Sequence, residues 1–197
     1  MSTTYAWPTT LPPAGCTLHL EPNLREFASP WTGSYDVIDL MGERWRMTVA
    51  LPPRLRGASG ALEAFFNRLR GINTVSAWHF GRERPAGTIA GSPTLSTGVA
   101  QGLQSLPITT TAYATVKAGD MLGVAGQLFQ VAADATASAG GALTALTVNR
   151  VRTALSGSAA VTWYRPTATF RLASPAVPVQ HLPAMVEGVE VGLIETW

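Results

Sequence analysis

Three histidines, His19, His79 and His181, are the side chains in this sequence best suited to bind a metal or to transfer protons. They lie far apart along the chain, and none stands in the HxH or HExxH spacing that brings two imidazoles onto one metal ion. Cys16 is the only cysteine, so neither an internal disulfide nor a thiolate cluster is available. We therefore predict no metal-binding residue, and we interpret the histidines as strand or loop residues and Cys16 as a packed thiol.

Hydrolytic chemistry has little support in the motifs. Serine hydrolases hold their nucleophile on a strained turn such as GxSxG, and the pairs Gly91-Ser92 and Gly157-Ser158 lack that frame. No phosphate-binding P-loop motif is present. Spacing alone does not exclude a carboxylate pair for glycoside hydrolysis, but most of the twelve Asp and Glu residues stand in strand or turn contexts. The sequence therefore predicts no catalytic residue, no cofactor-binding residue and no enzyme. The enzymatic alternative is a wall-degrading hydrolase that depends on His79 or Asp120.

Two further residues have a functional and a structural interpretation. Asp120, within Ala-Gly-Asp, is a candidate site residue, but an aspartate in a turn commonly binds its own backbone, and we favour that interpretation. Trp163 is a candidate platform for stacking a sugar. We favour the interpretation that Trp163 is a core aromatic residue at the end of a strand.

Composition indicates a protein that is covered by other subunits. Apolar residues make up 46% of the 197 residues and charged residues only 13%, against about 25% in typical soluble domains. The net charge is +2, and the arginines form scattered pairs rather than a basic tract, which argues against specific nucleic-acid binding. We expect neither a signal peptide nor a membrane-spanning segment. The alternative is a small monomer rich in Thr, Ala and Gly.

The distribution of charge predicts a small domain inserted into a host domain. Residues 1–90 carry 16 of the 26 charged residues, whereas residues 91–149 carry only Lys117, Asp120 and Asp134. We expect the host domain to comprise residues 1–90 and 166–197, with a small β-barrel-like domain at 91–165. The host should be mainly β, a sandwich or belt with one amphipathic helix.

The expected elements follow from hydrophobic periodicity. Residues 59–70 place apolar side chains at helical spacing, with Ser59 as N-cap and Gly71 at C′. Residues 187–194, rich in Val and Glu, are expected to form an exposed or edge strand. Other strands are expected at 17–22, 34–40, 44–51, 75–80, 143–150, 160–164 and 167–172, with a hairpin at 121–132.

A series of packing motifs runs along nearly the whole chain. The motifs are FASP at 27–30, TG at 32–33, GERW at 42–45, LEAFFNRLRG at 62–71, RPAG at 84–87, VKAGD at 116–120, GQLFQV at 126–131 and WYRPTATFRL at 163–172. Their order resembles that of tail structural proteins of long-tailed bacteriophages, in particular distal tail proteins. The resemblance depends on motifs of packing rather than of catalysis.

The resemblance implies a structural virion protein that is assembled in the host cytoplasm. It implies a belt domain that closes into a homo-oligomeric ring, expected to be a hexamer, at the distal end of the tail tube. The ring would connect the tube protein to the tip or baseplate hub proteins. The chain is too short for a full galectin-like C-terminal domain. The alternative function is a glycan-binding module of the tail, which predicts an exposed aromatic cleft near Trp163 or Tyr113. Candidate contacts between subunits are the arm at 5–13 and the tail at 186–197.

Overall fold

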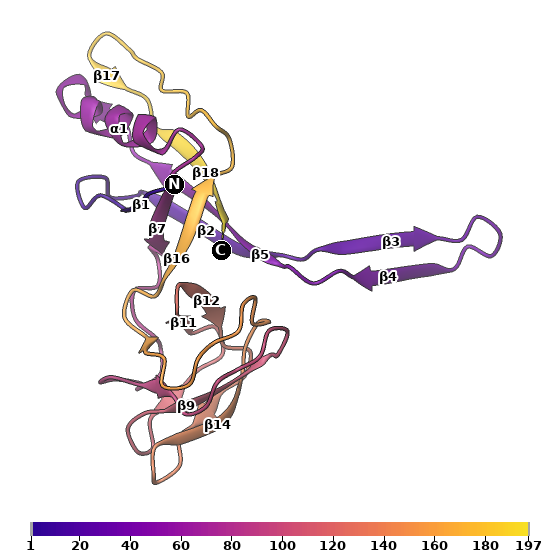
Figure 1. Ribbon diagram of the computed structural model, residues 1–197. Helices are drawn as coiled ribbons and strands as arrows, with labels where there is room; N and C mark the ends of the chain where they lie inside the picture. Colours follow the sequence, from indigo (N-terminus) through magenta and orange to yellow (C-terminus); the bar gives the residue numbers. More distant parts are fainter. Residues whose placement is uncertain (1, 197) are drawn as a thin grey trace.

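The computed structural model describes residues 2–196 and contains two β-rich units and a long projecting hairpin (Figure 1). Strands make up 43% of the residues, and the described part of the chain contains one α-helix. The predicted mainly β fold class with a single helix is therefore confirmed. One unit is a sheet built from both ends of the chain, and the other is formed by the middle of the sequence.

A six-stranded sheet forms the framework of the first unit. Four of the five pairings between neighbouring strands are antiparallel, and the pairing of the first strand with its only partner is parallel. In spatial order its strands are β1 (Thr4–Ala6), β7 (Thr74–Trp78), β16 (Thr167–Leu172), β18 (Val189–Glu195), β5 (Arg44–Leu51) and β2 (Gly15–Glu21).

Strand β5 shows how the sequence specifies the buried face of this sheet. Its side chains alternate, so that Trp45, Met47, Val49 and Leu51 are buried and Arg44 is exposed. This alternation was predicted from the sequence, because successive side chains of a strand point to opposite faces. The buried face joins the helix and part of the second unit in one hydrophobic core.

Strand β18 corrects one prediction. Residues 187–194 were expected to form an exposed or edge strand, but β18 lies inside the sheet, between β16 and β5. Val189, Val191 and Leu193 are buried, whereas Glu190 points to the opposite face and is exposed. An antiparallel sheet that is packed on only one face accepts charged residues on a central strand, so glutamate did not indicate an edge here.

The helix α1 (Arg56–Leu69) packs Leu62, Phe65, Phe66 and Leu69 against the sheet, as the spacing predicted. Its start differs from the expectation. The helix begins three residues before Ser59, and the position before its first residue is Leu55, which provides no side-chain cap. The Ser59 hydroxyl lies inside the helix and donates to the Arg56 carbonyl at 2.9 Å. A two-stranded sheet of β6 (Arg54–Leu55) and β17 (Met185–Val186) sets this earlier start.

Gly71 ends α1 at the predicted position and provides a test of the packing there. It has a φ of +68°, and an added Cβ would lie 3.2 Å from the Cα of Pro175. We expect Gly71→Ala to lower the free energy of unfolding by about 1–2 kcal/mol, because both the backbone conformation and the space exclude a side chain. Urea unfolding measures this loss.

Gly60 provides the matched control for that substitution. It lies inside α1 with no atom within 4 Å of an added Cβ. Gly60→Ala should therefore stabilise the chain by about 0.5–1 kcal/mol, the usual gain in helix propensity. Equal effects of the two substitutions would contradict this account.

The second unit consists of short sheets around a separate core, whose buried side chains run from Ile89 to Val161. In the described residues these sheets do not close into a barrel. Instead, three open sheets stand together. They are β12 (Gln127–Gln130), β11 (Met121–Val124) and β15 (Val161–Thr162); β14 (Ala142–Thr147), β9 (Ser105–Thr109) and β8 (Thr94–Leu95); and β10 (Thr115–Val116) with β13 (Ala135–Thr136).

The β11–β12 hairpin confirms a local prediction. Its two-residue turn is Ala125-Gly126, and both residues have positive φ, at 49° and 80°. Two positive φ values are the requirement of a type I′ turn, which matches the twist of the flanking strands. The hairpin also connects the two units, because Leu128 on β12 belongs to the core of the first unit.

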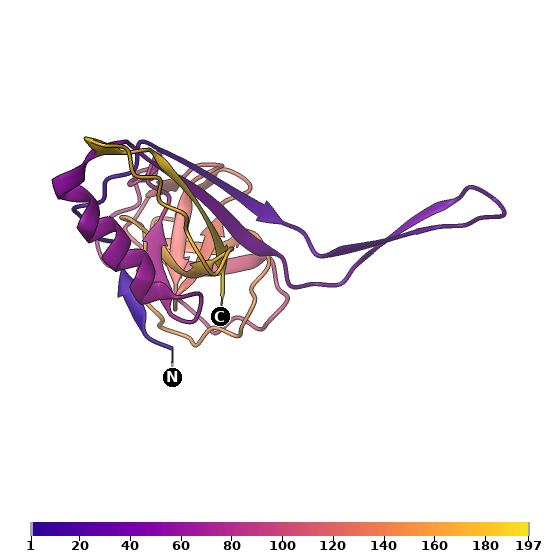
Figure 2. The same cartoon turned by 90° about the horizontal axis from the view of Figure 1, so that it is seen from above.

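A second hairpin leaves the body of the molecule. Strands β3 (Leu24–Ala28) and β4 (Tyr35–Asp39) pair only with each other and extend far from both units (Figures 1 and 2). All ten of their residues are exposed. The second strand was expected from the sequence, whereas the first was not. A two-stranded ribbon without a covering layer is marginally stable by itself.

Candidate functional site

The three histidines remain apart in the structure. His19 lies on β2, His79 follows β7, and the Nε2 atom of His181 lies 3.1 Å from a carboxylate oxygen of Glu63 on α1. Burial lowers the pKa of His79, and the nearby Arg82 lowers it further. Within residues 2–196 no group of three or more His, Cys, Asp or Glu side chains could hold a metal ion.

Cys16 packs beside the core on the buried face of β2. Burial raises the pKa of its thiol, with a smaller opposing effect from the Phe80 backbone. A raised pKa leaves little thiolate near neutrality, so this cysteine is poorly suited to act as a nucleophile.

No helix among the described residues is long and apolar enough to cross a membrane.

Asp120 is a structural acceptor at the boundary between the two units. One carboxylate oxygen accepts the amide of Ala86 at 2.7 Å, and the other accepts the amides of Gly87 and Lys117 at 3.1 and 2.8 Å. The side chain is buried. Asp120 therefore binds the backbone of its own turn, as favoured from the sequence, and also fixes the segment by which the chain enters the second unit.

The two aromatic residues named for a glycan-binding cleft, Trp163 and Tyr113, lie in different settings, and the Trp163 ring contacts that of Tyr164. Trp163 packs against the hydrophobic core of that unit, and its indole N–H donates to the Gly91 carbonyl at 3.0 Å. Tyr113 is exposed on a loop. A cavity of about 350 Å³ in this unit is lined by small and aliphatic side chains of residues 135–146. The geometry thus gives Trp163 a packing role.

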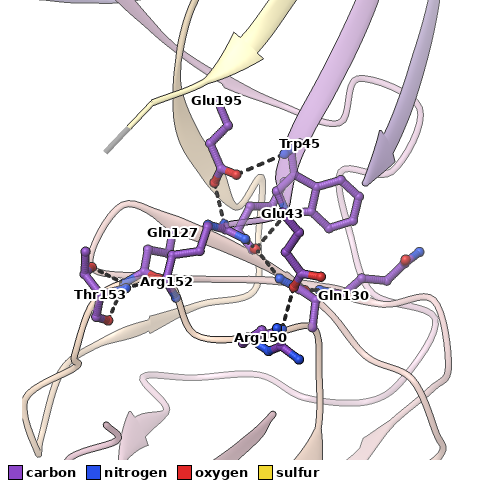
Figure 3. Close-up of polar contacts among 10 residues, drawn as sticks. Glu43, Trp45, Gln127, Gln130, Arg150, Arg152, Thr153 and Glu195 are labelled. Carbon is purple, nitrogen blue, oxygen red and sulfur yellow. Dashed lines mark hydrogen bonds and ion pairs between the residues drawn. The ribbon is translucent and has the colours of Figure 1, made fainter. Parts of the chain in front are cut away.

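A buried ion pair joins the two units (Figure 3). Arg152 of the second unit donates to Glu195 of β18 at 2.5 Å, and each side chain is only 2% exposed. The other oxygen of Glu195 accepts the backbone N–H of Trp45 at 3.1 Å. Arg152 and the Trp45 indole both donate to the Leu128 carbonyl, at 3.0 and 2.9 Å. Groups from both units therefore bond to one another in a buried place.

Further side chains surround this junction pair. The side-chain carbonyl oxygen of Gln127 accepts the Arg152 backbone N–H at 2.9 Å, and the side-chain NH₂ group of Gln127 donates to the Thr153 hydroxyl at 2.7 Å. Glu43 accepts the backbone N–H of Arg150 at 2.8 Å. The Gln127 bonds lie within the second unit and hold the backbone of Arg152 in place, whereas the Glu43 bond connects the second unit to the segment that leads into β5. Sequence reasoning missed the whole junction because its members come from residues 43–45, 127–130, 150–153 and 195.

Comparison with known proteins adds no assignment to these arrangements. No protein-family model matches the chain, and a search of curated proteins finds no match. The two segments expected to contact other subunits both pack in part against the core of this chain. Trp7 and Leu11 of the arm are buried in the core, and the tail forms strand β18. Trp197 lies outside the described residues.

The β3–β4 hairpin is instead the most exposed apolar part of the molecule. Trp31 at its tip is 93% exposed, and the other large apolar side chains between residues 24 and 41 are also exposed. A soluble monomer rarely presents such a concentration of apolar surface, and larger exposed patches mark interaction sites. The exposed apolar residues are Leu24, Phe27, Trp31, Tyr35, Val37, Ile38, Leu40 and Met41.

The hairpin is held at both ends. At the tip, the Ser29 hydroxyl accepts the amides of Trp31 and Thr32, and the Ser29 amide donates to the Ser34 carbonyl at 2.8 Å. At the base, the Asn23 side chain donates to the Met41 carbonyl at 2.9 Å. The hairpin therefore has a defined conformation that presents its apolar side chains outward.

The Asp39–Arg150 ion pair, at 2.8 Å, connects the base of the hairpin to the second unit. The Met41 amide lowers the pKa of Asp39, and Arg150 lowers it further. Because the pKa of Asp39 is lower in the folded chain than in the unfolded chain, the ionised carboxylate stabilises the folded chain at pH values above the ordinary pKa of aspartate, about 3.9. This contribution is lost as the pH falls through the folded value. We expect Arg150→Gln to raise the pKa of Asp39 in an NMR titration.

Asp134 is the internal control for this titration. Lys117 lowers its pKa, followed by the Ala118 amide, and neither group contacts Arg150. The pKa of Asp134 should therefore stay unchanged in Arg150→Gln. An unchanged Asp39 pKa in the same spectra would show that the ion pair does not form.

Proposed function

We propose that this chain is a structural subunit of a bacteriophage tail that assembles with copies of itself into a ring at the distal end of the tail tube. The ring connects the tube to the tip or baseplate hub, and the chain catalyses no reaction. The observation that carries the proposal is the projecting β3–β4 hairpin, whose apolar side chains, including Trp31 at 93% exposure, have no cover in the chain itself.

Two other features support an assembling subunit. Both edges of the six-stranded sheet, β1 and β2, have unpaired outer backbones in the described residues, and a free edge is a template for pairing with another chain. The low charge of 13% fits a surface that is covered after assembly. The resemblance of the ordered packing motifs to distal tail proteins supplies the place in the tail.

The mass of the native particle tests this proposal. We expect sedimentation velocity to give a defined multimer and electron microscopy of the purified protein to show closed rings, with six copies as the resemblance implies. Labelled chain should lie at the distal end of the tube in tail particles. A monomer at all concentrations, or a label distributed elsewhere in the particle, would contradict the proposal.

A further inference from the structure

Both faces of the hairpin are apolar enough to require a cover. Directly paired residues of an antiparallel ribbon share a face. One face therefore carries Leu24, Val37 and Tyr35, and the other carries Phe27 and Ile38. Each face also carries charged residues. A ribbon of this kind is suited to insertion between protein surfaces, because contact on one face alone leaves the other apolar face in water.

The tip provides an anchor for such an insertion. Trp31 is held outward by the bonds of its turn to Ser29 and is the most exposed large apolar side chain among the described residues. Tryptophan is enriched among the residues that dominate binding energy at protein interfaces. Ordering of the turn before binding reduces the entropy lost when the hairpin docks.

A complementary patch lies on the β6–β17 sheet beside α1. We define the acceptor patch as Leu55, Leu182 and Met185, which are 76%, 37% and 39% exposed. Leu55 and Met185 face each other across the two strands, and the Leu182 amide donates to the Met185 carbonyl at 2.8 Å. The three residues are therefore neighbours on a hydrogen-bonded backbone support, and each has an exposed apolar side chain.

The hairpin and the acceptor patch lie at opposite ends of the subunit (Figures 1 and 2). From this arrangement we infer that the hairpin of one copy docks on the acceptor patch of the next copy, with Trp31 as its anchor. Two different surfaces at opposite ends create a head-to-tail contact, which generates a ring when its rotation closes. The inference rests on the proposed assembly of the chain with itself and names the surfaces that would meet.

Charge supports this pairing. Residues 24–41 contain Arg25 against three carboxylates, Glu26, Asp36 and Asp39, of which Asp39 is paired with Arg150. The acceptor patch is flanked along the chain by Arg54 and Arg56 and by one carboxylate, Glu187, and the first turn of α1 contains no acidic residue. The N-terminal end of a helix also carries a partial positive charge. The carboxylates of Glu26 and Asp36 would therefore meet a surround in which two arginines outnumber one glutamate, which favours association in the proposed orientation.

Exchange of single side chains tests the two surfaces separately. We expect Trp31→Ala and Leu55→Glu each to raise the dissociation constant between copies by about 30-fold or more, the effect of losing a dominant interface residue. The matched controls are Tyr113→Ala and Ile72→Glu, at side chains that are 68% and 71% exposed away from both surfaces. Sedimentation velocity over a concentration series should show wild-type association for both controls.

Mixing the two defective variants gives the decisive result. Trp31→Ala keeps its acceptor patch and Leu55→Glu keeps its hairpin, so the mixture should form a one-to-one heterodimer that cannot grow further. Multimers that persist in both variants, or a mixture without heterodimer, would overturn the docking while leaving assembly intact. A wild-type chain that stays monomeric would overturn both the docking and the proposed function.

Discussion

Substitution of either member of the buried Arg152–Glu195 pair is expected to lower the free energy of unfolding by about 3–5 kcal/mol. Arg152→Met leaves the Glu195 carboxylate without its cation in a place that is only 2% exposed, and Glu195→Leu leaves the guanidinium without its anion. Burial raises the pKa of Glu195 and lowers that of Arg152, and the opposite charges offset part of both shifts. Urea unfolding of the two variants measures the loss.

The double variant separates the pairing from the burial of charge. Arg152→Met combined with Glu195→Leu replaces both charges by apolar side chains of similar size, and should be more stable than either single variant. A remaining cost of about 1–3 kcal/mol is expected, because the Trp45 amide loses its acceptor. Additive single effects would show that the two side chains do not act as a pair.

An exposed ion pair provides the comparison. Lys117 and Asp134 also form a contact at 2.8 Å, but their side chains are about half exposed. Lys117→Met should change stability far less than Arg152→Met, because solvent screens an exposed pair and replaces its bonds. A similar loss of stability in Lys117→Met and Arg152→Met would show that the effect comes from removing a cation rather than from its burial.

Local patterns predicted those parts of the fold in which neighbouring residues decide the structure. The alternation of β5, the apolar stripe of α1, the C-terminal Gly71 and the Ala125-Gly126 turn all follow from short windows of sequence. Each depends on periodicity or on a backbone conformation that few residues adopt. These features are therefore accessible without knowledge of the rest of the chain.

Predictions failed for those features that depend on contacts between distant segments. The start of α1 depends on pairing between β6 and β17, which are about 130 positions apart, so Ser59 misled as a cap signal. The place of β18 at the centre of the sheet depends on which strands flank it. Strand β3 lacks a clean alternation because neither face is buried within the chain. Its signal is an excess of apolar residues without a core to receive them.

The candidate surfaces divide in the same way. The turn role of Asp120 was favoured because an aspartate in a turn binds nearby amides. Its contacts with residues 86–87 needed the fold, since they cross 33 and 34 positions. The junction pair could not be found from sequence, because Arg152 and Glu195 stand in unrelated local contexts and meet only when the second unit docks on the sheet.

Loss of the Asp120 carboxylate is expected to be the most damaging change at the entry to the second unit. Asp120→Ala would leave three backbone amides, of Ala86, Gly87 and Lys117, without their acceptor in a partly buried place. Unsatisfied buried donors cost about 1–3 kcal/mol each, and partial access of water reduces the sum, so we expect a loss of about 3–5 kcal/mol. Asp120→Asn should be nearly as harmful, because its amide group would face at least one N–H donor.

Hydrogen exchange distinguishes this cause from a general loosening. The amides of Ala86, Gly87 and Lys117 should exchange faster in Asp120→Ala even under strongly stabilising conditions, since their protection depends on the carboxylate itself. The matched control is Asp134→Ala, at an exposed aspartate that accepts the neighbouring Ala118 amide at 2.8 Å. It should accelerate exchange at that amide alone and change the unfolding midpoint far less. Unchanged protection at the amides of Ala86, Gly87 and Lys117 in Asp120→Ala would show that Asp120 does not hold the boundary between the two units.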